Sequence, residues 1–439
     1  MENMEHTTPR QPTRRRKKRK SWKRMVRAYL PLAVVVLLII LFIIFAVGSV
    51  NRANERREQE RQESLAIESS IAQQQADWEL EALQLVRESE KYAVSCHWDK
   101  AIAVLDQFSG NPSDFAVLMN ARETYEQGDR NLVSWEDTKN IPFLSFGKLI
   151  MDPITGFSGT DGEDNRYLYI SCPEFTAILQ QLYDNGYMLV DMDDIFTTLT
   201  AEDGSSVILQ NDLRLPAGKK PIVLIHAQTG GYDNKLVNVA GDIQSLVTPE
   251  SGESYTGSYD FVPLLEDFIE SHPGFSYKGA RAILAITAGK NIFGYELNDV
   301  TTITECANNL KEKGYTLASG TYGNIAYGKV DIESLKDDIE SWETNVEPLL
   351  GETEILAYAK SSDIDDGKGS YGSSNKKYQQ LYNAGFKYYL GTCYNSSPWM
   401  DISNTTIRMG RIVVNGNYLK EKASMYAGLF DATRVYGTK

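Results

Sequence analysis

The pattern of apolar and polar positions changes three times along the chain. Residues 28–50 form an apolar run without a single charged residue. About 20 helical residues are needed to cross the ~30 Å hydrocarbon core of a bilayer, so this run predicts one transmembrane helix. A buried core helix would show a polar face, and the apolar region of a cleaved signal peptide is shorter and ends at a small-residue cleavage site. Both alternatives fit the run less well.

Two polar, helix-favouring regions follow the apolar run. Residues 51–77 are charged and Gln-rich and contain neither Pro nor Gly, which favours a helical stalk. Their few strongly apolar residues do not sustain a heptad seam, so any coiled coil there is weak. Residues 78–127 show three helical patterns, with a break between the second and third at Gly110-Asn111-Pro112. This region resembles a tetratricopeptide-like helical hairpin, or it is a spacer that packs on the next domain.

Beyond residue 128 the pattern becomes an alternation of buried-type strands and amphipathic helices. The strand patterns lie at residues 141–146, 187–190, 219–228, 280–286, 315–319, 354–358 and 386–390, and the helical patterns at residues 173–185, 261–271, 304–313, 332–350 and 375–384. Two polar insertions, residues 200–215 and 229–259, flank the third strand. The alternation predicts the α/β class, with a distorted β/α barrel over residues 135–439. In such barrels the chemistry lies at the C-terminal ends of the strands.

Charge is distributed unevenly between the two sides of the apolar run. Residues 1–27 contain eleven Lys and Arg residues against Glu2 and Glu5, whereas the whole chain of 439 residues has a net charge of −14. The positive-inside rule therefore places residues 1–27 in the cytoplasm as a basic tail and the remainder outside a cell membrane that the chain crosses once. The residues after the basic tail are acidic, which excludes nucleic-acid binding by bulk electrostatics. The basic tail is expected to contact anionic lipid headgroups.

Cysteines and acidic segments often bind metals in proteins, but neither forms a recognisable metal-binding motif in this sequence. Four cysteines, Cys96, Cys172, Cys306 and Cys393, are widely spaced without a CxxC pair. We interpret them as buried small apolar residues, because such spacing demands neither a disulfide nor a zinc site. The acidic segment 363–369 lacks the alternate-position ligands and distal Glu of an EF-hand, so a solvated loop is favoured over a calcium site.

Several segments in order resemble the polysaccharide deacetylase (NodB-homology) superfamily of carbohydrate esterases, from about Ile141 to the C-terminus. The similarity is greatest to membrane-anchored members from Gram-positive bacteria. The matching segments read IPFLSFGKLIMDP, PEFTAILQQLYDNGYMLVDMDDI, LPAGKKPIVL, YDFVPLLEDFIESHPGFSYKGARAILAIT, LKEKGYTLASGTYGN and LYNAGFKYYLGT. The resemblance implies that these segments form successive strands and helices of that family's barrel.

The resemblance also implies chemistry that this sequence lacks. The family holds a divalent metal with one Asp and two His, and a second Asp acts as base toward the N-acetyl group. The two Asp positions match Ala227 and Gln228, and the two His positions match Gly320 and Asn324. The family's Arg-x-Pro motif aligns with residues 357–361 without its Pro and Gly, and the late Leu-x-His has no counterpart because no histidine follows His272. We therefore predict no metal, no other cofactor and no catalytic residue of the family type.

Residues near the expected site are candidates for ligand contacts. His226 and Gln228 face one side of the strand and Ala227 faces the other by the period-2 rule. His226 is either a pocket residue, with Tyr232 and Asp233 contacting a sugar, or a hydrogen-bonded histidine that fills a gap at the barrel end. His272, in Ser271-His272-Pro273, reads as a surface turn.

Other candidates lie on the later strand ends. Asn324 matches one of the family's two histidine positions. Together with Tyr358 and Trp399 it completes the set of candidate ligand-contacting residues. Four aromatic residues are either platforms for sugar stacking or caps of the core: Tyr358, Tyr371, Tyr394 and Trp399.

The sequence supports three functional hypotheses. The first is a membrane-anchored, extracytoplasmic pseudoenzyme that binds cell-wall polysaccharide or peptidoglycan, or that scaffolds an envelope enzyme. The second is an active metal-dependent N-deacetylase with a non-standard site, for instance His226 with Asp233 or Asp401. The third is an interaction protein that acts through residues 78–127, binding an envelope partner or associating with itself through the helical stalk.

Overall fold

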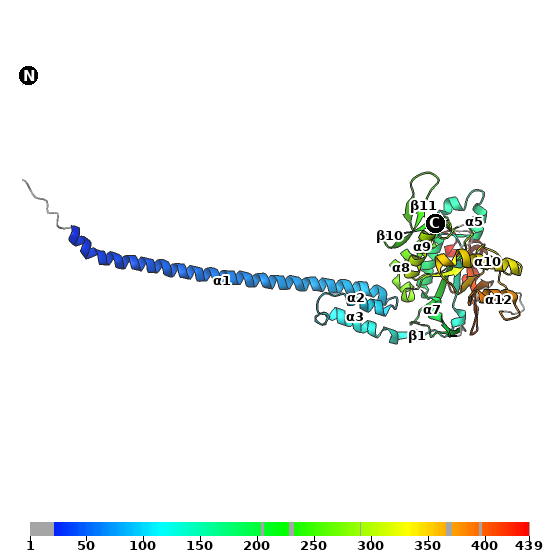
Figure 1. The fold of residues 1–439 in the computed structure, drawn as a ribbon, viewed down its shortest axis with the longest axis horizontal. Helices are drawn as coiled ribbons and strands as arrows, with labels where there is room; N and C mark the ends of the chain where they lie inside the picture. The colour runs from blue at the N-terminus through cyan, green and yellow to red at the C-terminus, as the bar shows by residue number, and fades with distance from the viewer. Residues whose placement is uncertain are drawn as a thin grey trace, which may run out of the picture. The chain divides into compact units, whose positions relative to one another are not determined.

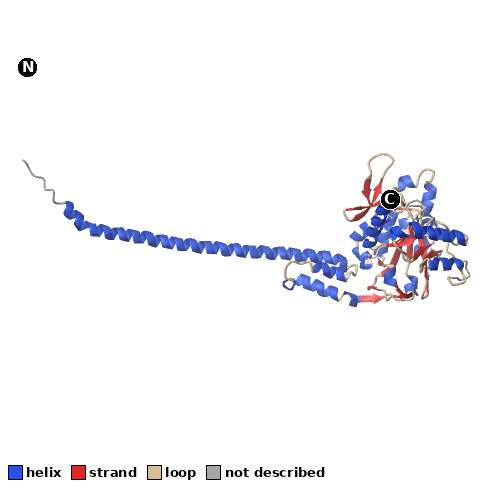
Figure 2. Ribbon diagram, viewed as in Figure 1, coloured by secondary structure: helices blue, strands red, loops and turns tan. Residues whose placement is uncertain are grey.

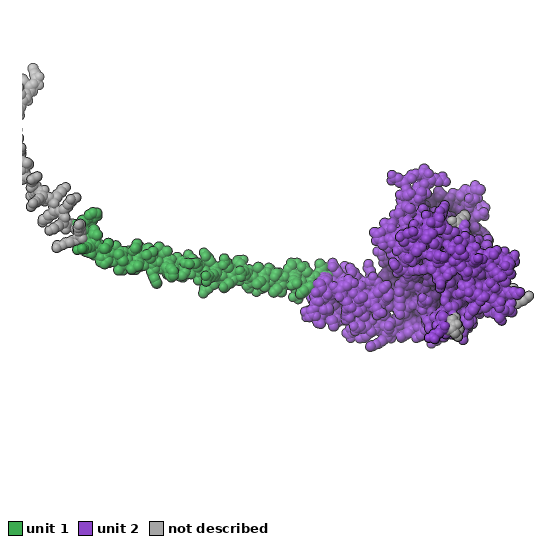
Figure 3. Space-filling view, in the orientation of Figure 1, with its two compact units in different colours: residues 1–80 green, residues 81–439 purple. Residues whose placement is uncertain are grey.

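The computed structural model describes residues 22–202, 206–227, 232–289, 291–365, 371–394 and 397–438. For residues 23–25 it describes the backbone alone. The chain divides into two compact units, residues 1–80 and 81–439 (Figure 3). Helix α1, Trp22–Ala93, contains the whole predicted membrane segment (Figure 1). From Val26 onward it is long and apolar enough to cross a bilayer, and its most apolar 18-residue window is completely exposed.

The start of the second unit is a small helical layer. The end of α1 packs with α2 (Trp98–Leu105) and α3 (Ala116–Glu126). The Ser89 hydroxyl lies 3.0 Å from the Tyr125 hydroxyl in its core, and the Trp98 ring stacks on Tyr125. A Cβ atom at Gly128 would lie 2.4 Å from the Trp98 ring, so only glycine lets the chain turn there.

A closed parallel barrel forms the centre of the second unit, with helices around the strands (Figure 2). Its seven strands are, in order around the ring, β9 (Lys220–Ala227), β13 (Ile283–Ile286), β14 (Thr316–Ser319), β15 (Ile355–Ala357), β16 (Tyr388–Cys393), β18 (Ile407–Val414) and β2 (Phe143–Phe146), which returns to β9. This ring confirms the predicted β/α-barrel fold class.

Strand β9 is shared between two neighbours on one side. Its first residues, Lys220–Ile222, pair with β5 (Tyr187–Leu189), and its last three, Ile225–Ala227, pair with β13. This division is possible because β9 is eight residues long, whereas β5 and β13 are short. The result is the distortion of the barrel.

Side-chain alternation along β9 separates two apolar layers. Val223 and Ile225 point into the barrel with Phe143 and Met409. The alternate residues point outward against the helices that cover the barrel. Those helices are α6 (Cys172–Asp184), α8 (Phe261–Ser271), α9 (Val300–Lys313), α10 (Ile332–Asn345), α11 (Glu347–Leu350), α12 (Lys376–Asn383) and α13 (Gly416–Glu421).

Both polar insertions form antiparallel sheets. Residues 200–215 contain part of a hairpin of β6 (Phe196–Thr200) with β7 (Ser206–Gln210), and β8 (Arg214–Pro216) pairs with β1 (Leu132–Ser134). Residues 229–259 hold the sheet of β10 (Lys235–Val239), β11 (Asp242–Val247) and β12 (Tyr255–Gly257), in which β10 and β11 project from the barrel (Figure 1). The remaining strands and α-helices of the described residues are β3 (Leu149–Ile150), β4 (Ile170–Ser171), β17 (Met400–Ile402), α4 (Pro153–Gly156), α5 (Gly162–Leu168), α7 (Met192–Ile195) and α14 (Ala432–Val435).

Two details differ from the sequence prediction. The helix predicted over residues 332–350 is two helices, because the chain kinks at Val346 just before Glu347 and Pro348. Only minor elements were predicted after residue 390, yet β18 is an eight-residue barrel strand. Arg408 and Arg411 interrupt its apolar run, which concealed the strand.

Three of the four cysteines, Cys96, Cys172 and Cys393, are buried, and Cys306 is partly buried. Burial raises the pKa of Cys96 to about 11 and those of Cys172 and Cys306 to about 12. These thiols are therefore protonated at neutral pH.

Candidate functional site

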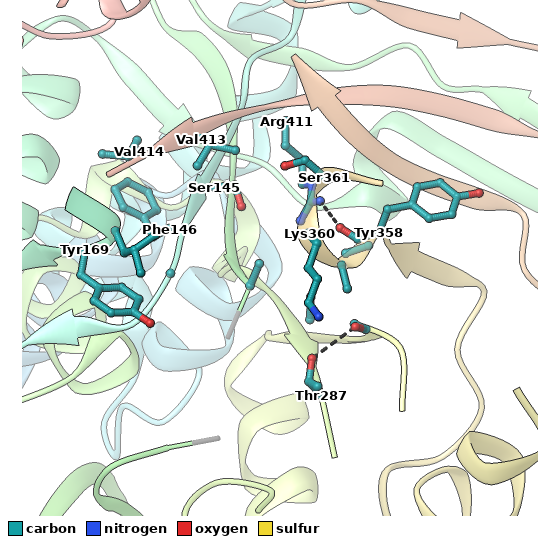
Figure 4. A pocket seen from close by; sticks show the side chains of 17 residues that line it. Ser145, Phe146, Tyr169, Thr287, Tyr358, Lys360, Ser361, Arg411, Val413 and Val414 are labelled. Atoms are coloured by element: carbon teal, nitrogen blue, oxygen red, sulfur yellow. Dashed lines mark hydrogen bonds between the residues drawn. The ribbon is translucent and has the colours of Figure 1, made fainter. Parts of the chain in front are cut away.

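A cavity of about 270 Å³ opens at the C-terminal ends of the barrel strands (Figure 4). Residues from β2, β9, β13, β14, β15 and β18 and from the loops that follow them line it: Ser145, Phe146, Gly147, Leu168, Tyr169, Ala227, Ala285, Thr287, Gly320, Ala357, Tyr358, Ala359, Lys360, Ser361, Arg411, Val413 and Val414. This is the end of the barrel where the fold class predicts a functional site.

The cavity exists because the last inward-facing residues of the strands are small. On β2 the inward position changes from Phe143 to Ser145, and on β9 from Ile225 to Ala227. β13 and β15 change in the same way, from isoleucine to alanine. On β18 the inward face instead carries a long polar side chain, Arg411, two residues before the inward-facing Val413.

Arg411 is a buried cation in the cavity wall. Its side chain is only 4% exposed. Nε donates to the carbonyl oxygen of Gly391 at 3.0 Å, and one terminal nitrogen donates to the carbonyl oxygen of Tyr358 at 2.7 Å. Burial lowers the pKa of Arg411 to about 10, with a small opposing effect from Tyr394. The guanidinium is therefore charged at neutral pH, and within the described residues it forms no ion pair.

Lys360 adds a second cation at the rim. It lies in the short turn Ala359–Ser361, and both Lys360 and Ser361 have φ of 53°. Such a left-handed conformation costs roughly 1–2 kcal/mol for each non-glycine residue. The Lys360 side chain is exposed and extends across the opening toward the strand end that carries Thr287 (Figure 4).

Strained backbone also follows β14 on the same side of the cavity. Thr321 has φ of 72° and Asn324 has φ of 53°, so four of the eight described non-glycine residues with positive φ lie in these two loops. For a β-branched residue such as Thr321 this conformation is a clear outlier. Strain of this kind gathers at functional sites because the surrounding structure must hold it.

The positions of the family's metal ligands do not fit a metal. Ala227 and Gly320 line the cavity but carry no donor atom, and Gln228 lies outside the described residues. A Cβ atom at Gly320 would lie 2.8 Å from both the Ile286 carbonyl oxygen and the Thr287 hydroxyl, so a histidine side chain has no room there. In the described part of the chain no group of three His, Cys, Asp or Glu residues is arranged to hold a metal ion.

His226 does not line the cavity. It faces outward from β9, is 1% exposed, and stacks on Phe261 with ring centroids 4.7 Å apart. Burial lowers the pKa of His226 to about 3, although the nearby Gly147 backbone opposes the shift. Neither ring nitrogen has a well-formed hydrogen bond to another described residue. His226 is thus a neutral core residue, packed on an aromatic ring rather than held by hydrogen bonds.

His272, the other barrel histidine, lies at the opposite end of α8. It caps the helix C-terminus and stacks on Phe268 at 4.3 Å between ring centroids. It is half-buried by this packing and is not a simple surface turn. Since an 11-residue helix is about 16 Å long, the two histidines cannot share a metal.

Tyr232 and Asp233 are also outside the cavity wall. The Tyr232 ring is buried beside His226 and Phe293, and its backbone N–H donates to the Asn291 side chain at 2.7 Å. Asp233 forms an ion pair with Lys148 at the surface. The structure therefore does not bring His226 together with Asp233 in a polar pocket.

Of the predicted aromatic residues, only Tyr358 borders the cavity. Its hydroxyl group lies 2.6 Å from the Tyr371 hydroxyl, and its ring belongs to a buried aromatic cluster. Trp399 packs against Gly410 on β18, where a Cβ atom would lie 2.3 Å from the indole nitrogen. Tyr169, which the sequence analysis did not identify, presents a half-buried ring at the lip (Figure 4).

The acidic residues near segment 363–369 are ion-paired with an arginine. Arg408 lies 3.2 Å from Asp363, 2.9 Å from Asp365 and 3.4 Å from Asp401. Residues 366–370 lie outside the described residues. Asp401, the alternative partner of His226, is thus held on β17 by Arg408.

These observations define a closed seven-stranded β/α barrel whose strand ends surround a cavity with cationic side chains and no carboxylate among its described wall residues. No protein-family profile and no curated protein sequence matches the chain.

The solved structures that are similar to this chain include two deacetylases. The deacetylase PplD of Streptococcus pyogenes, in complex with acetate, is 14% identical, with 63% of this chain and 93% of that chain covered and a TM-score of 0.35. BC0361, a polysaccharide deacetylase from Bacillus cereus, is 13% identical, with 65% and 68% covered and a TM-score of 0.36.

Proposed function

We propose that this protein is a membrane-anchored, extracytoplasmic pseudoenzyme whose barrel mouth binds cell-wall polysaccharide or peptidoglycan without hydrolysing it. One observation carries the proposal: Ala227 and Gly320, at positions where a metal-dependent deacetylase needs donor atoms, border an open cavity. The binding space is present, but the donors that would activate a water molecule are absent from these positions.

Membrane attachment is part of the same proposal. The apolar window of α1 is completely exposed in the structure, and such a surface is stable only in lipid or against another protein. The basic residues before it support a cytoplasmic N-terminus.

Binding and hydrolysis are separable by experiment. The full-length protein, purified in a polyoxyethylene ether detergent, is incubated with insoluble peptidoglycan and sedimented, and acetate release is measured on the same samples with and without added zinc, cobalt or nickel. We expect sedimentation with the polymer and no acetate above the protein-free control. Acetate release that requires a metal would overturn the pseudoenzyme proposal. Failure to sediment, with the polymer intact, would contradict polymer binding and favour a role through residues 78–127.

A further inference from the structure

We infer that the barrel mouth contains an anion-binding subsite, in which Arg411 and Lys360 take an oxyanion group of the ligand, either a carboxylate or a phosphate. This inference rests on the proposed function only for the polymer that would present the group. The subsite itself depends only on the residues of the cavity wall.

Arg411 is a charged group without a counter-charge among the described residues. Arginine carries five N–H donors, and the two hydrogen bonds formed by Arg411 go to the neutral carbonyl oxygens of Gly391 and Tyr358. Buried charges in proteins are normally paired. The cavity that Arg411 borders is the space from which a ligand anion can approach its remaining donors.

Two carboxylates near this wall, Asp363 and Asp365, are ion-paired with another arginine. Asp363 approaches the far side of β16, where its Oδ2 would lie 3.2 Å from a Cβ atom at Gly391. It accepts hydrogen bonds from Arg408 at 3.2 Å and from the Tyr371 hydroxyl at 2.7 Å. Asp365 is paired with the same arginine. Neither carboxylate forms an ion pair with Arg411, so none of these groups neutralises the cavity.

Lys360 places a second cation over the same space. The turn Ala359–Ser361 holds Lys360 and Ser361 at positive φ, a conformation that non-glycine residues adopt at a cost. This turn directs the Lys360 side chain across the mouth (Figure 4). The hydroxyl group of Ser145 also lies in the wall. Two cations and a hydroxyl group, with no carboxylate among the described lining residues, favour an anion over a cation or a neutral sugar.

The space is suited to a small group rather than to a whole polymer. A water molecule occupies about 30 Å³ in the liquid, so a cavity of about 270 Å³ admits a sugar ring or an acidic substituent with some water. The small residues Ser145, Ala227 and Ala357 leave the approach to Arg411 open.

Thermal unfolding of the full-length protein tests the subsite. Midpoints are measured by tryptophan fluorescence in sodium chloride, sodium acetate and sodium phosphate at equal ionic strength, because a ligand that binds only the folded state raises the midpoint. We expect acetate or phosphate to raise the midpoint above the chloride value. A larger effect of phosphate would indicate a phosphate-bearing polymer, and a larger effect of acetate an acidic sugar.

Variants decide whether the effect belongs to this cavity. Arg411→Met should abolish the anion-dependent shift, and Lys360→Gln, at an exposed position that leaves the core intact, should raise the anion concentration needed for half of the shift by 3–10-fold, as expected for about 0.7–1.4 kcal/mol. Lys376→Gln, an exposed lysine on α12 with the same change of charge, should behave as the wild type. The basic tail is common to all variants.

Equal anion shifts in the wild type and Lys360→Gln, or no shift above chloride in the wild type, would overturn the subsite. If Lys360→Gln still sediments with the polymer and its anion response equals that of the wild type, the subsite is refuted but the proposed function stands. If the anion shift depends on Arg411 but the protein does not sediment with the polymer, the subsite stands and the proposed polymer binding is refuted.

Discussion

The buried carboxylate of Asp338 accepts a hydrogen bond from the backbone N–H of Tyr322 at 2.8 Å. It accepts two more, from the Gly323 N–H at 2.7 Å and the Tyr327 hydroxyl at 2.8 Å. Helix α10 thereby holds the loop after β14, which contains Thr321 and Asn324 with positive φ. One side chain thus offsets part of the strain at the cavity wall.

Replacing Asp338 with Asn should destabilise the protein by about 1–3 kcal/mol, because the amide has only one oxygen and leaves a partly buried N–H group without its acceptor. The measurement is urea unfolding of the full-length protein. Asp337→Asn, at the adjacent exposed position, is the control and should stay within about 0.5 kcal/mol of wild type. Equal effects of the two substitutions would show that Asp338 does not hold the loop.

Gly320→Ala should destabilise the barrel by about 1–3 kcal/mol, because the new methyl group would press against β13 at 2.8 Å from the Ile286 carbonyl oxygen. The control is Gly372→Ala, where a Cβ atom meets nothing within 4 Å and the change should be nearly neutral. Urea unfolding midpoints compare the two. If both substitutions were neutral, the steric argument against a histidine at residue 320 would fail.

Asp260 should make stability fall as the pH rises through the mildly acidic range. Burial raises its pKa from 3.8 to about 7 in the folded protein, although the Phe261 N–H and Lys148 oppose the shift. The folded state therefore binds more protons than the unfolded state between about pH 4 and pH 7, and the stabilisation present at low pH is lost as the pH rises. A shift of this size corresponds to at most about 4 kcal/mol.

The difference in unfolding free energy between Asp260→Asn and the wild type, measured at pH 4 and pH 7, tests this expectation. Asn keeps an acceptor oxygen for the Phe261 N–H at the start of α8 and removes the titration, so the variant should gain stability relative to the wild type at pH 7. Asp267→Asn, on the exposed face of α8, should show no such change. A difference that does not vary with pH would contradict the assignment to Asp260.

Deletion of residues 28–50 should move the protein from the membrane fraction to the soluble fraction, because the exposed apolar window of α1 is then lost. Alkaline extraction of membranes followed by immunoblotting measures the distribution. Deletion of residues 51–73, which is equally long and polar, should leave the protein in the membrane. Retention of the first variant would indicate attachment through another part of the chain.

Much of the barrel could be predicted from periodicity alone. The bounds of α8 coincide with the predicted range 261–271, because the Asp260 cap and the amphipathic pattern mark its ends. β18 was missed because two arginines broke its pattern. Arg411 faces inward and donates hydrogen bonds to Gly391 on the neighbouring strand β16 and to Tyr358 after β15, contacts that local sequence does not record.

For the candidate site, the sequence pattern did not show which side of a strand faces the barrel interior. The period-2 rule correctly separated His226 from Ala227, but it could not decide which of the two faces the barrel interior. That depends on where α8 and Phe261 pack, a tertiary contact. Lys360 was not singled out either, because only the left-handed turn directs it over the cavity.

The position of β18 in the ring has a consequence for biosynthesis. β2 pairs on one side with β9 and on the other with β18, so that Phe143 lies beside Arg411. Since the chain is made from its N-terminus, β2 must keep an unpaired edge until residues 407–414 have been synthesised. Unpaired edges of this kind invite aggregation. Correct assembly therefore depends on β18, and a chain that stopped before residue 407 would leave the barrel open.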